Sequence, residues 1–319
     1  MKYREFGKTS LKVSEIGMGC WAIGGNEFGN SYGPTDDAKS IMAIKKAVEL
    51  GCNFFDTADV YGQGHSEELL GMALKKTTEK VRESIIIATK VGGSYMYGDR
   101  WGRMNFSEEY IRFALEKSLQ RLQTSYIDIY QLHNPPIEII KDGKIFKIMR
   151  ELQKEGKIRH IGISVHTIDE GVASLKYVDS IQCVFNMLYP NNYELIEAAK
   201  IKGIGIIARE PLCNGFLTDK MTEFSSEDSD KGPAFEKGDI RNYMSDNYKK
   251  KLIEHAKNFR EILSYRKESL SQLALKYVLA FKSISVVIPG AKTTEQIEEN
   301  MRSSDIPDLT VKDMDLLGS

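Results

Sequence analysis

Short apolar runs and longer amphipathic stretches alternate along most of the chain. Each run has the length of one strand, and each stretch that follows spaces its apolar residues like one helix face. In residues 107–123, Ser107 is a good helix N-cap, and Ile111, Leu115 and Leu119 form the apolar stripe behind it. The predicted strands are Ser14–Cys20, Asn53–Asp56, Ile85–Lys90, Ile127–His133, Ile158–Ser164, Ile181–Phe185, Ile204–Ala208 and Ser285–Ile288, and the predicted helices are Asp36–Leu50, Ser66–Lys76, Ser107–Gln123, Ile139–Glu155, Thr167–Tyr177, Asn192–Ile201, Ser271–Phe281 and Thr293–Arg302.

Eight consecutive strand–helix units predict an α/β fold of the (β/α)8 TIM barrel type. Two short β-like runs within Lys2–Val13 predict an N-terminal hairpin that closes the barrel bottom. Residues 209–248 follow the seventh strand as a long loop insertion, and we expect a single domain over residues 1–319. An open doubly wound sheet is the competing architecture. The one Gly-rich pattern, at residues 203–208, lies inside a predicted strand rather than at the strand-to-helix turn that such a sheet uses.

Composition narrows the class of protein. The chain is 41% hydrophobic with a net charge of −1, which does not favour a nucleic-acid partner or a membrane surface. No apolar run is long enough for a membrane span, and the N-terminus has no apolar signal core. The four cysteines are far apart in sequence, which indicates no zinc site or disulfide scaffold. We therefore expect a cytoplasmic protein without metal, either a monomer or a small homo-oligomer.

Ionisable residues follow three neighbouring strands at the rim where parallel barrels place their active sites. Asp56 ends the second predicted strand, Lys90 the third and His133 the fourth, while Tyr61 follows Asp56 in the next loop. Each residue alone also has a purely structural interpretation. Lys90 is the hardest to explain that way, because it follows an apolar run and needs a partner such as Asp56.

Together these four side chains suit proton transfer to a carbonyl oxygen. A lysine ammonium beside Tyr61 is expected to lower the pKa of the phenol and so improve it as a proton donor. Asp56 would hold that ammonium in place, and His133 would orient the substrate oxygen. A barrel aldolase that uses Lys90 as a Schiff base is an alternative, although pairing with Asp56 keeps the lysine protonated.

The motifs around these residues resemble the aldo-keto reductase superfamily. They are NFFDTADVYGQGHSEELLG at residues 53–71, the strand-end lysine of IIIATK at 85–90, and DIYQLHNP at 128–135. The resemblance is strongest to bacterial reductases and relatives of potassium-channel β-subunits that carry an IPGA-type motif. It implies NADPH-dependent reduction of an aldehyde or ketone, with Asp56, Tyr61, Lys90 and His133 as the catalytic tetrad. A non-catalytic NADP(H)-binding redox sensor remains an alternative.

The segment from Val287 to Asn300 is the clearest cofactor signal. A strand leads there into a helix whose N-terminus suits an anion, although Thr293 and Gln296 also fit a simple capping box. The resemblance implies that Lys292 pairs with the NADPH 2′-phosphate. Gln296 stands where many relatives have arginine, so NADH is not excluded. The implied cofactor-binding residues are Gly19, Cys20, Trp21, Asp56, Ser164, Gln182, Arg209, Pro211, Leu212, Gly215, Leu217, Gly290, Lys292, Gln296, Glu299 and Asn300.

Aromatic residues near the barrel mouth indicate an apolar substrate pocket for a small carbonyl compound. The predicted substrate residues are Trp21, Tyr61, Tyr95, Trp101 and His133. For the aromatic members, packing of the loops onto the scaffold is an equally good explanation.

Overall fold

Eight parallel strands form one sheet, in which each strand pairs with the next along the chain. The computed structural model describes residues 1–27, 31–75, 79–93, 104–224 and 233–318. The sheet curls until its two edges meet, because Ile16 bridges to Val287 and Gly19 bridges to Gly290. The predicted (β/α)8 barrel is therefore confirmed. Its strands are β3 (Met18–Gly19), β4 (Phe54–Asp56), β5 (Ile86–Val91), β6 (Ile127–His133), β7 (Ile158–Ser164), β8 (Ser180–Val184), β9 (Gly205–Arg209) and β10 (Val286–Val287).

An antiparallel hairpin of β1 (Tyr3–Glu5) and β2 (Lys12–Ser14) closes the bottom of the barrel. Phe6 directly follows β1 and is fully buried, and the centroid of its ring lies 5.7 Å from that of Phe54 in β4. The same apolar cluster contains Val13 from the hairpin and Ile129 from the middle of β6. The barrel interior is thus filled with side chains from below, which leaves the opposite end of the strands for the site.

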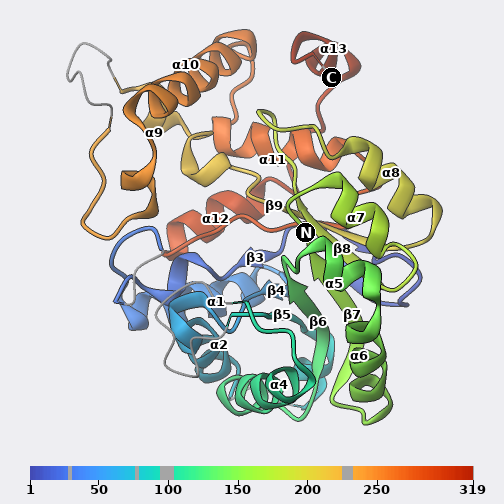
Figure 1. Cartoon of the computed structure of the whole chain (residues 1–319). Helices are drawn as coiled ribbons and strands as arrows, with labels where there is room; N and C mark the ends of the chain where they lie inside the picture. The colour runs from blue at the N-terminus through green and yellow to red at the C-terminus, as the bar shows by residue number, and fades with distance from the viewer. Residues whose placement is uncertain (28–30, 76–78, 94–103, 225–232, 319) are drawn as a thin grey trace.

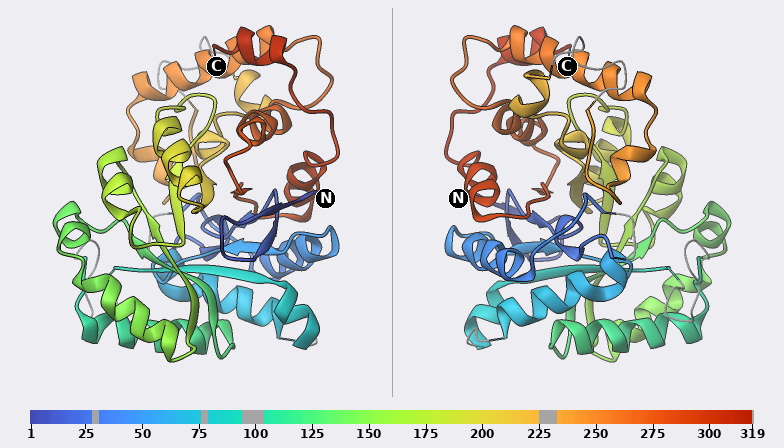
Figure 2. Two further views of the ribbon diagram at one scale, coloured as in Figure 1. Left: turned by 90° about the vertical axis from the view of Figure 1, so that its right-hand side faces the viewer. Right: turned by 90° about the vertical axis from the view of Figure 1, so that its left-hand side faces the viewer.

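Helices surround the strands on the outside of the barrel (Figures 1 and 2). Their apolar stripes pack on the sheet, as in α4, where Ile111, Leu115 and Leu119 are buried as predicted. No helix in the described part of the chain is long and apolar enough to cross a membrane. The α-helices are α1 (Asp37–Glu49), α2 (His65–Leu74), α3 (Glu79–Ser84), α4 (Glu108–Leu122), α5 (Ile137–Asp142), α6 (Lys144–Lys154), α7 (Ile168–Ser174), α8 (Tyr193–Ile201), α9 (Asp219–Thr222), α10 (Asp246–Ile262), α11 (Leu270–Ala280), α12 (Thr294–Arg302) and α13 (Val311–Leu316), and the short 3-10 turns are η1 (Ala22–Gly24), η2 (Tyr61–Gly64), η4 (Cys213–Gly215) and η5 (Ile240–Tyr243).

The single helix predicted over Ile139–Glu155 is wrong, because two helices, α5 and α6, meet there at Gly143. Gly143 has a φ of +73°, a left-handed conformation that interrupts the helical hydrogen bonds. A Cβ atom at this position would lie 2.7 Å from the hydroxyl oxygen of Tyr177, so the break is also fixed by packing.

Besides the short helices α3 and α9, two further helices, α10 and α13, were not predicted from the sequence. Ser245 caps α10 by accepting from the backbone N–H of Tyr248, so the helix begins inside the 209–248 segment. Its buried face includes Leu252, Ile253 and Ala256. At the C-terminus, Thr310 and Asp313 form a capping box that starts α13. Both helices lie at the periphery of the barrel (Figure 1).

Asp128 anchors the lower end of the barrel at the start of β6. Its buried carboxylate accepts hydrogen bonds from Arg82 at 3.1 Å, Arg159 at 3.0 Å and the backbone N–H of Ile87 at 3.0 Å. Asp128→Ala is expected to lower the free energy of unfolding by about 3 kcal/mol, because two partly buried guanidinium groups and a buried N–H lose their hydrogen-bond acceptor. Urea unfolding tests this, and a loss below about 1 kcal/mol would contradict the anchoring role.

Candidate active site

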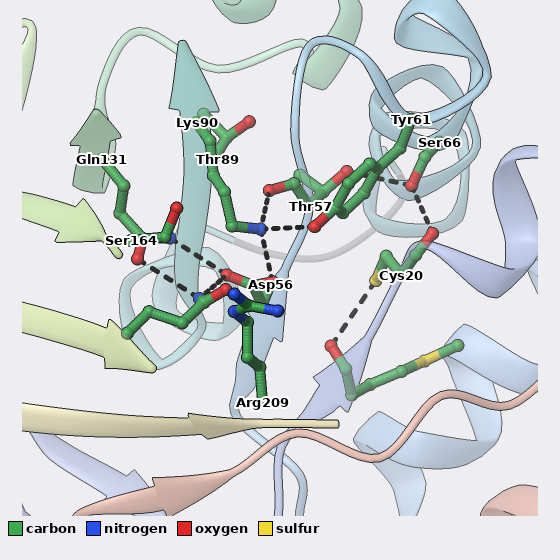
Figure 3. A network of polar contacts seen from close by, with 12 residues as sticks. Cys20, Asp56, Thr57, Tyr61, Ser66, Thr89, Lys90, Gln131, Ser164 and Arg209 are labelled. Carbon is green, nitrogen blue, oxygen red and sulfur yellow. Dashed lines mark hydrogen bonds and ion pairs between the residues drawn. The ribbon is translucent and has the colours of Figure 1, made fainter. Parts of the chain in front are cut away.

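Four predicted catalytic side chains meet at the upper rim of the barrel. Asp56 is the last residue of β4, His133 is the last residue of β6, and Lys90 lies near the end of β5 between them. Tyr61 opens the short η2 turn that follows β4. Because the strands are parallel, their carboxyl ends face the same side, which brings the four groups together (Figure 3 shows three of them).

The Lys90 ammonium is the centre of this arrangement. Its Nζ donates to Oδ2 of Asp56 at 2.6 Å, to the carbonyl oxygen of Thr57 at 2.9 Å and to the hydroxyl oxygen of Tyr61 at 2.8 Å. The side chain of Lys90 is fully buried. The His133 ring stands edge-on to the Tyr61 ring, with 6.0 Å between centroids. The tetrad predicted from the sequence is therefore assembled around one buried cation.

Burial sets the protonation of the site. Burial by itself would lower the pKa of Lys90, but Asp56 and Tyr61 outweigh it and raise that pKa above its usual value, so the ammonium stays charged. The pKa of Tyr61 is also raised, because burial exceeds the opposing effect of Lys90. The expected lowering of the tyrosine pKa is therefore wrong as a net direction. Burial, and then Lys90 and Arg209, place the pKa of His133 well below its usual range, so its ring is neutral.

Two glutamine amides hold the other oxygen of Asp56. Gln131 Nε2 donates to Oδ1 at 3.0 Å, and Gln182 Nε2 donates to the same oxygen at 2.7 Å. Gln182 was predicted as a cofactor contact, and in this structure its amide faces Asp56. Gln131 was missed, although its position two residues before His133 in a strand places both side chains on one face of the sheet.

A second set of hydrogen bonds joins the strand ends beside Tyr61. The hydroxyls of Thr57 and Ser66 lie 2.9 Å apart, and Ser66 donates to the carbonyl oxygen of Cys20 at 2.7 Å (Figure 3). Trp21 follows Cys20 in the chain, and the centroid of its ring lies 6.1 Å from that of the Tyr61 ring. These contacts connect the ends of β3 and β4 with the start of α2, so the wall around Tyr61 is one packed unit.

A cleft of about 780 Å³ runs from Tyr61 and His133 to the N-terminal end of α12. Of the predicted cofactor residues, Cys20 and Leu217 do not line it, since both side chains are buried in the core. Tyr95 and Trp101 lie outside the described residues. The predicted residues that line the cleft are Gly19, Trp21, Asp56, Tyr61, His133, Ser164, Gln182, Arg209, Pro211, Leu212, Gly215, Gly290, Lys292, Gln296, Glu299 and Asn300.

Besides the predicted Arg209, polar side chains that were not predicted line the cleft, among them Asn134, His166 and Glu210. Near the tetrad, Asn134 accepts a hydrogen bond from Ser164 at 2.9 Å. Arg209 pairs with Glu210 and lies 3.4 Å from Nδ1 of His166. The buried Nε of Arg209 has no hydrogen-bond partner among the described residues. Asn134 and Arg209 therefore give this part of the cleft wall polar side chains.

At the far end, Lys292 lies half-buried beside the start of α12. Its ammonium donates to the carbonyl oxygens of Tyr32 and Pro34, and burial lowers its pKa. Thr293 caps the helix, as the sequence indicated, but Gln296 does not complete a capping box. Its side chain instead accepts from the backbone N–H of Lys292 at 2.8 Å, which fixes the loop that carries the lysine.

Comparison with known proteins identifies the class. The model of the Aldo/keto reductase family matches residues 15–319, so the chain belongs to this family. It is 33% identical over 322 residues to the protein named "Uncharacterized oxidoreductase YqkF" of Bacillus subtilis, covering 100% of this chain and 96% of that protein. It is 32% identical over 319 residues to the "NADH-specific methylglyoxal reductase" of Escherichia coli, covering 96% of this chain and 94% of that protein.

The structural comparison agrees. The holo form of aldo-keto reductase AKR11C1 from Bacillus halodurans matches with a TM-score of 0.82 and 31% identity, covering 100% of this chain and 95% of that one. A "Probable voltage-gated potassium channel subunit beta" of Arabidopsis thaliana is 28% identical over 320 residues, covering 96% of this chain and 92% of that protein. The resemblance stated from the sequence is confirmed, and the chain is an enzyme of the aldo-keto reductase type.

Proposed function

We propose that this enzyme reduces a small aldehyde or ketone to an alcohol with NADPH, and that Tyr61 donates the proton. The observation that carries the proposal is the buried Lys90 ammonium, which donates to the Tyr61 hydroxyl oxygen and to Asp56 at once. A positive charge at that oxygen stabilises the phenolate that remains after proton donation. Because the pKa of Tyr61 is raised, the phenol carries its proton at neutral pH.

The other members of the tetrad prepare this step. Neutral His133 lines the cleft beside Tyr61 and can donate a ring N–H to the substrate oxygen, which orients it and stabilises the charge that develops there. Asp56, held by Gln131 and Gln182, keeps the Lys90 ammonium in place. The charged state of Lys90 argues against an aldolase that uses it as a Schiff base, since that chemistry needs a neutral amine.

The described residues fit a nicotinamide dinucleotide. The cleft is lined by Tyr61 and His133 of the tetrad and also by Lys292 and other residues at the start of α12. Arg209, which lines the cleft, would face the nicotinamide, while Lys292, Gln296 and Asn300 would hold the adenosine end. When bound, the cofactor supplies the hydride. We also infer a reducing, cytoplasmic location, which the four buried, unpaired cysteines support.

The preference for NADPH over NADH is expected to depend on Lys292. Lys292→Met should weaken NADPH binding about 10- to 100-fold, because one charge-assisted contact with the 2′-phosphate is lost, and leave NADH binding unchanged. Titration of both nucleotides by fluorescence measures the effect. Equal losses for the two nucleotides would contradict this role.

Gln296 offers the opposite test, in which a cation is added near the proposed 2′-phosphate site instead of removed. Gln296→Arg adds a cation one helical turn from Lys292 and removes the oxygen that accepts from the backbone N–H of Lys292. It is expected to strengthen the binding of NADPH relative to that of NADH, which the same titration measures. The E. coli relative carries "NADH-specific" in its name, and a Schizosaccharomyces pombe relative carries "[NADP(+)]", so both cofactors occur among similar proteins.

A further inference from the structure

The turn that carries Tyr61 has an unusual backbone. Within η2, Gly62 has a φ of 59°, Gln63 a φ of 53° and Gly64 a φ of 98°. Three successive residues are thus left-handed, a conformation that costs the two glycines little but is unfavourable for Gln63, so the turn benefits from outside support. The position of the Tyr61 hydroxyl therefore depends on what packs against this turn.

The turn is held from two sides. On one side the backbone of η1 lies against it, so closely that a Cβ atom at Gly62 would collide with the carbonyl group of Gly24. On the other side lies the side chain of Arg121, from the last turn of α4. A Cβ atom at Gly64 would lie 2.6 Å from Nε of Arg121. The guanidinium group therefore fills the space against the end of the turn.

Arg121 is itself fixed by a fully buried carboxylate. Glu67 follows Gly64 in the first turn of α2 and has no exposed surface. Its Oε2 lies 2.7 Å from Nε and 2.6 Å from Nη2 of Arg121, and its Oε1 accepts from the hydroxyl of Thr89 at 2.5 Å. Thr89 precedes Lys90 in β5. One buried ion pair thus connects the Tyr61 turn with the strand that carries Lys90.

We propose that Glu67 and Arg121 are positioning residues, which keep the Tyr61 hydroxyl in hydrogen-bond contact with the Lys90 ammonium. The inference rests on the proposed function, because it assigns the pair a role in proton donation by Tyr61. Neither side chain is among the residues that line the cleft, so neither contacts substrate or cofactor. The two N–H contacts to one oxygen fix the guanidinium in one orientation, which an apolar residue of the same size would not do.

The chain offers a matched control for this pair. Arg82 and Asp128 form a similar ion pair, with side-chain exposures of 16% and 1%, against 13% and 0% for Arg121 and Glu67. That pair lies at the opposite end of the barrel, because Asp128 is the second residue of β6 and His133 is its last. Replacing either arginine removes one cation from a buried carboxylate, but only Arg121 supports the Tyr61 turn.

The experiment compares Arg121→Met with Arg82→Met in kcat, in NADPH affinity and in thermal unfolding. Both variants are expected to unfold at lower temperature. Arg121→Met should reduce kcat about 100-fold, with the NADPH Kd changed by less than about twofold, since a displacement near 1 Å in a reacting group has an effect of that size. Arg82→Met should keep the wild-type kcat. Arg121→Lys, which keeps the charge, should recover part of the loss.

A double-mutant cycle separates positioning from general damage. If Arg121 acts through Tyr61, then Arg121→Met should not lower the residual single-turnover rate further in the Tyr61→Phe background. If Arg121→Met does not fold, Thr89→Val provides the same test in milder form, because it removes only the hydroxyl bond to Glu67. It should lower kcat severalfold without changing NADPH affinity.

Equal effects of Arg121→Met and Arg82→Met on kcat would overturn the positioning role, as would additive losses in the cycle. The positioning role would also be overturned if the single variants Thr89→Val and Arg121→Met both kept the wild-type kcat. These outcomes leave the proposed function intact. The proposed function fails instead if Tyr61→Phe itself keeps the wild-type rate, whatever the Arg121 variants do.

Discussion

Tyr61→Phe is expected to lower kcat for carbonyl reduction by about 10²- to 10⁴-fold, the range that a positioned general acid contributes. Phenylalanine keeps the ring that packs beside Trp21 and His133 and removes only the hydroxyl that contacts Lys90. The NADPH Kd should therefore stay within about twofold of wild type. Steady-state kinetics and fluorescence titration of the same preparation measure both quantities. A variant that keeps its rate would show that another group donates the proton.

The pH dependence of the wild-type enzyme follows from the same group. Reduction needs protonated Tyr61, so the rate is lost as pH rises through the pKa of the phenol. Because that pKa lies above its usual value of 10.0, kcat/KM for reduction should show no loss from this group until the pH exceeds about 10. A fall in kcat/KM between pH 7 and about 9 that vanishes in Tyr61→Phe would contradict the raised pKa.

Lys90→Met is expected to have the second large effect, on both activity and stability. Without the ammonium the pKa of Tyr61 rises further, and the phenolate loses its counter-charge, so kcat should fall at least about 10²-fold. Among the described residues the buried carboxylate of Asp56 then keeps the two glutamine amides as side-chain partners but no cation, which should lower the free energy of unfolding by about 3–5 kcal/mol. Enzyme assays and urea unfolding measure the two losses.

Lys276→Met is the control for Lys90. Lys276 is another buried lysine, in α11, and its ammonium lies 2.6 Å from the carboxylate of Asp308. Neither residue lines the cleft. We expect this variant to lose stability and to keep its kcat. If Lys90→Met lowered stability in the same way but kept its rate, then Lys90 would be a structural lysine and the proposed proton donation would lack its charge partner.

The fold was predictable because barrel strands and their covering helices have clear patterns. Continuous apolar runs such as the one before Lys90 indicate buried parallel strands, and stripes such as that of α4 indicate helices on their outside. The break at Gly143 was not predicted, because a glycine within an amphipathic stretch is common and only the left-handed backbone seen in the structure shows that this one interrupts the helix. The start of α10 was hidden by the polar residues that precede it.

The site was predictable where residue type and strand end coincide. Asp56 and His133 are ionisable residues that end their strands and Lys90 is one residue from the end of its strand, so parallel topology brings them together. The direction in which the pKa of Tyr61 shifts could not be predicted, because the sequence shows the neighbouring charge but not the burial that outweighs it. Likewise, nothing in the spacing of Glu67 and Arg121 indicates a contact. Only the packing of α2 on α4 brings them together.

The most direct test of the account is the loss of the reduced-nicotinamide absorbance when purified enzyme meets NADPH and a panel of small aldehydes and ketones. We expect the wild type to oxidise NADPH in a substrate-dependent reaction that is lost in Tyr61→Phe. The panel should include methylglyoxal, which a relative's name specifies. Tight NADPH binding without oxidation of the cofactor by any carbonyl of the panel would contradict the account and favour a redox-sensing role for the same cleft.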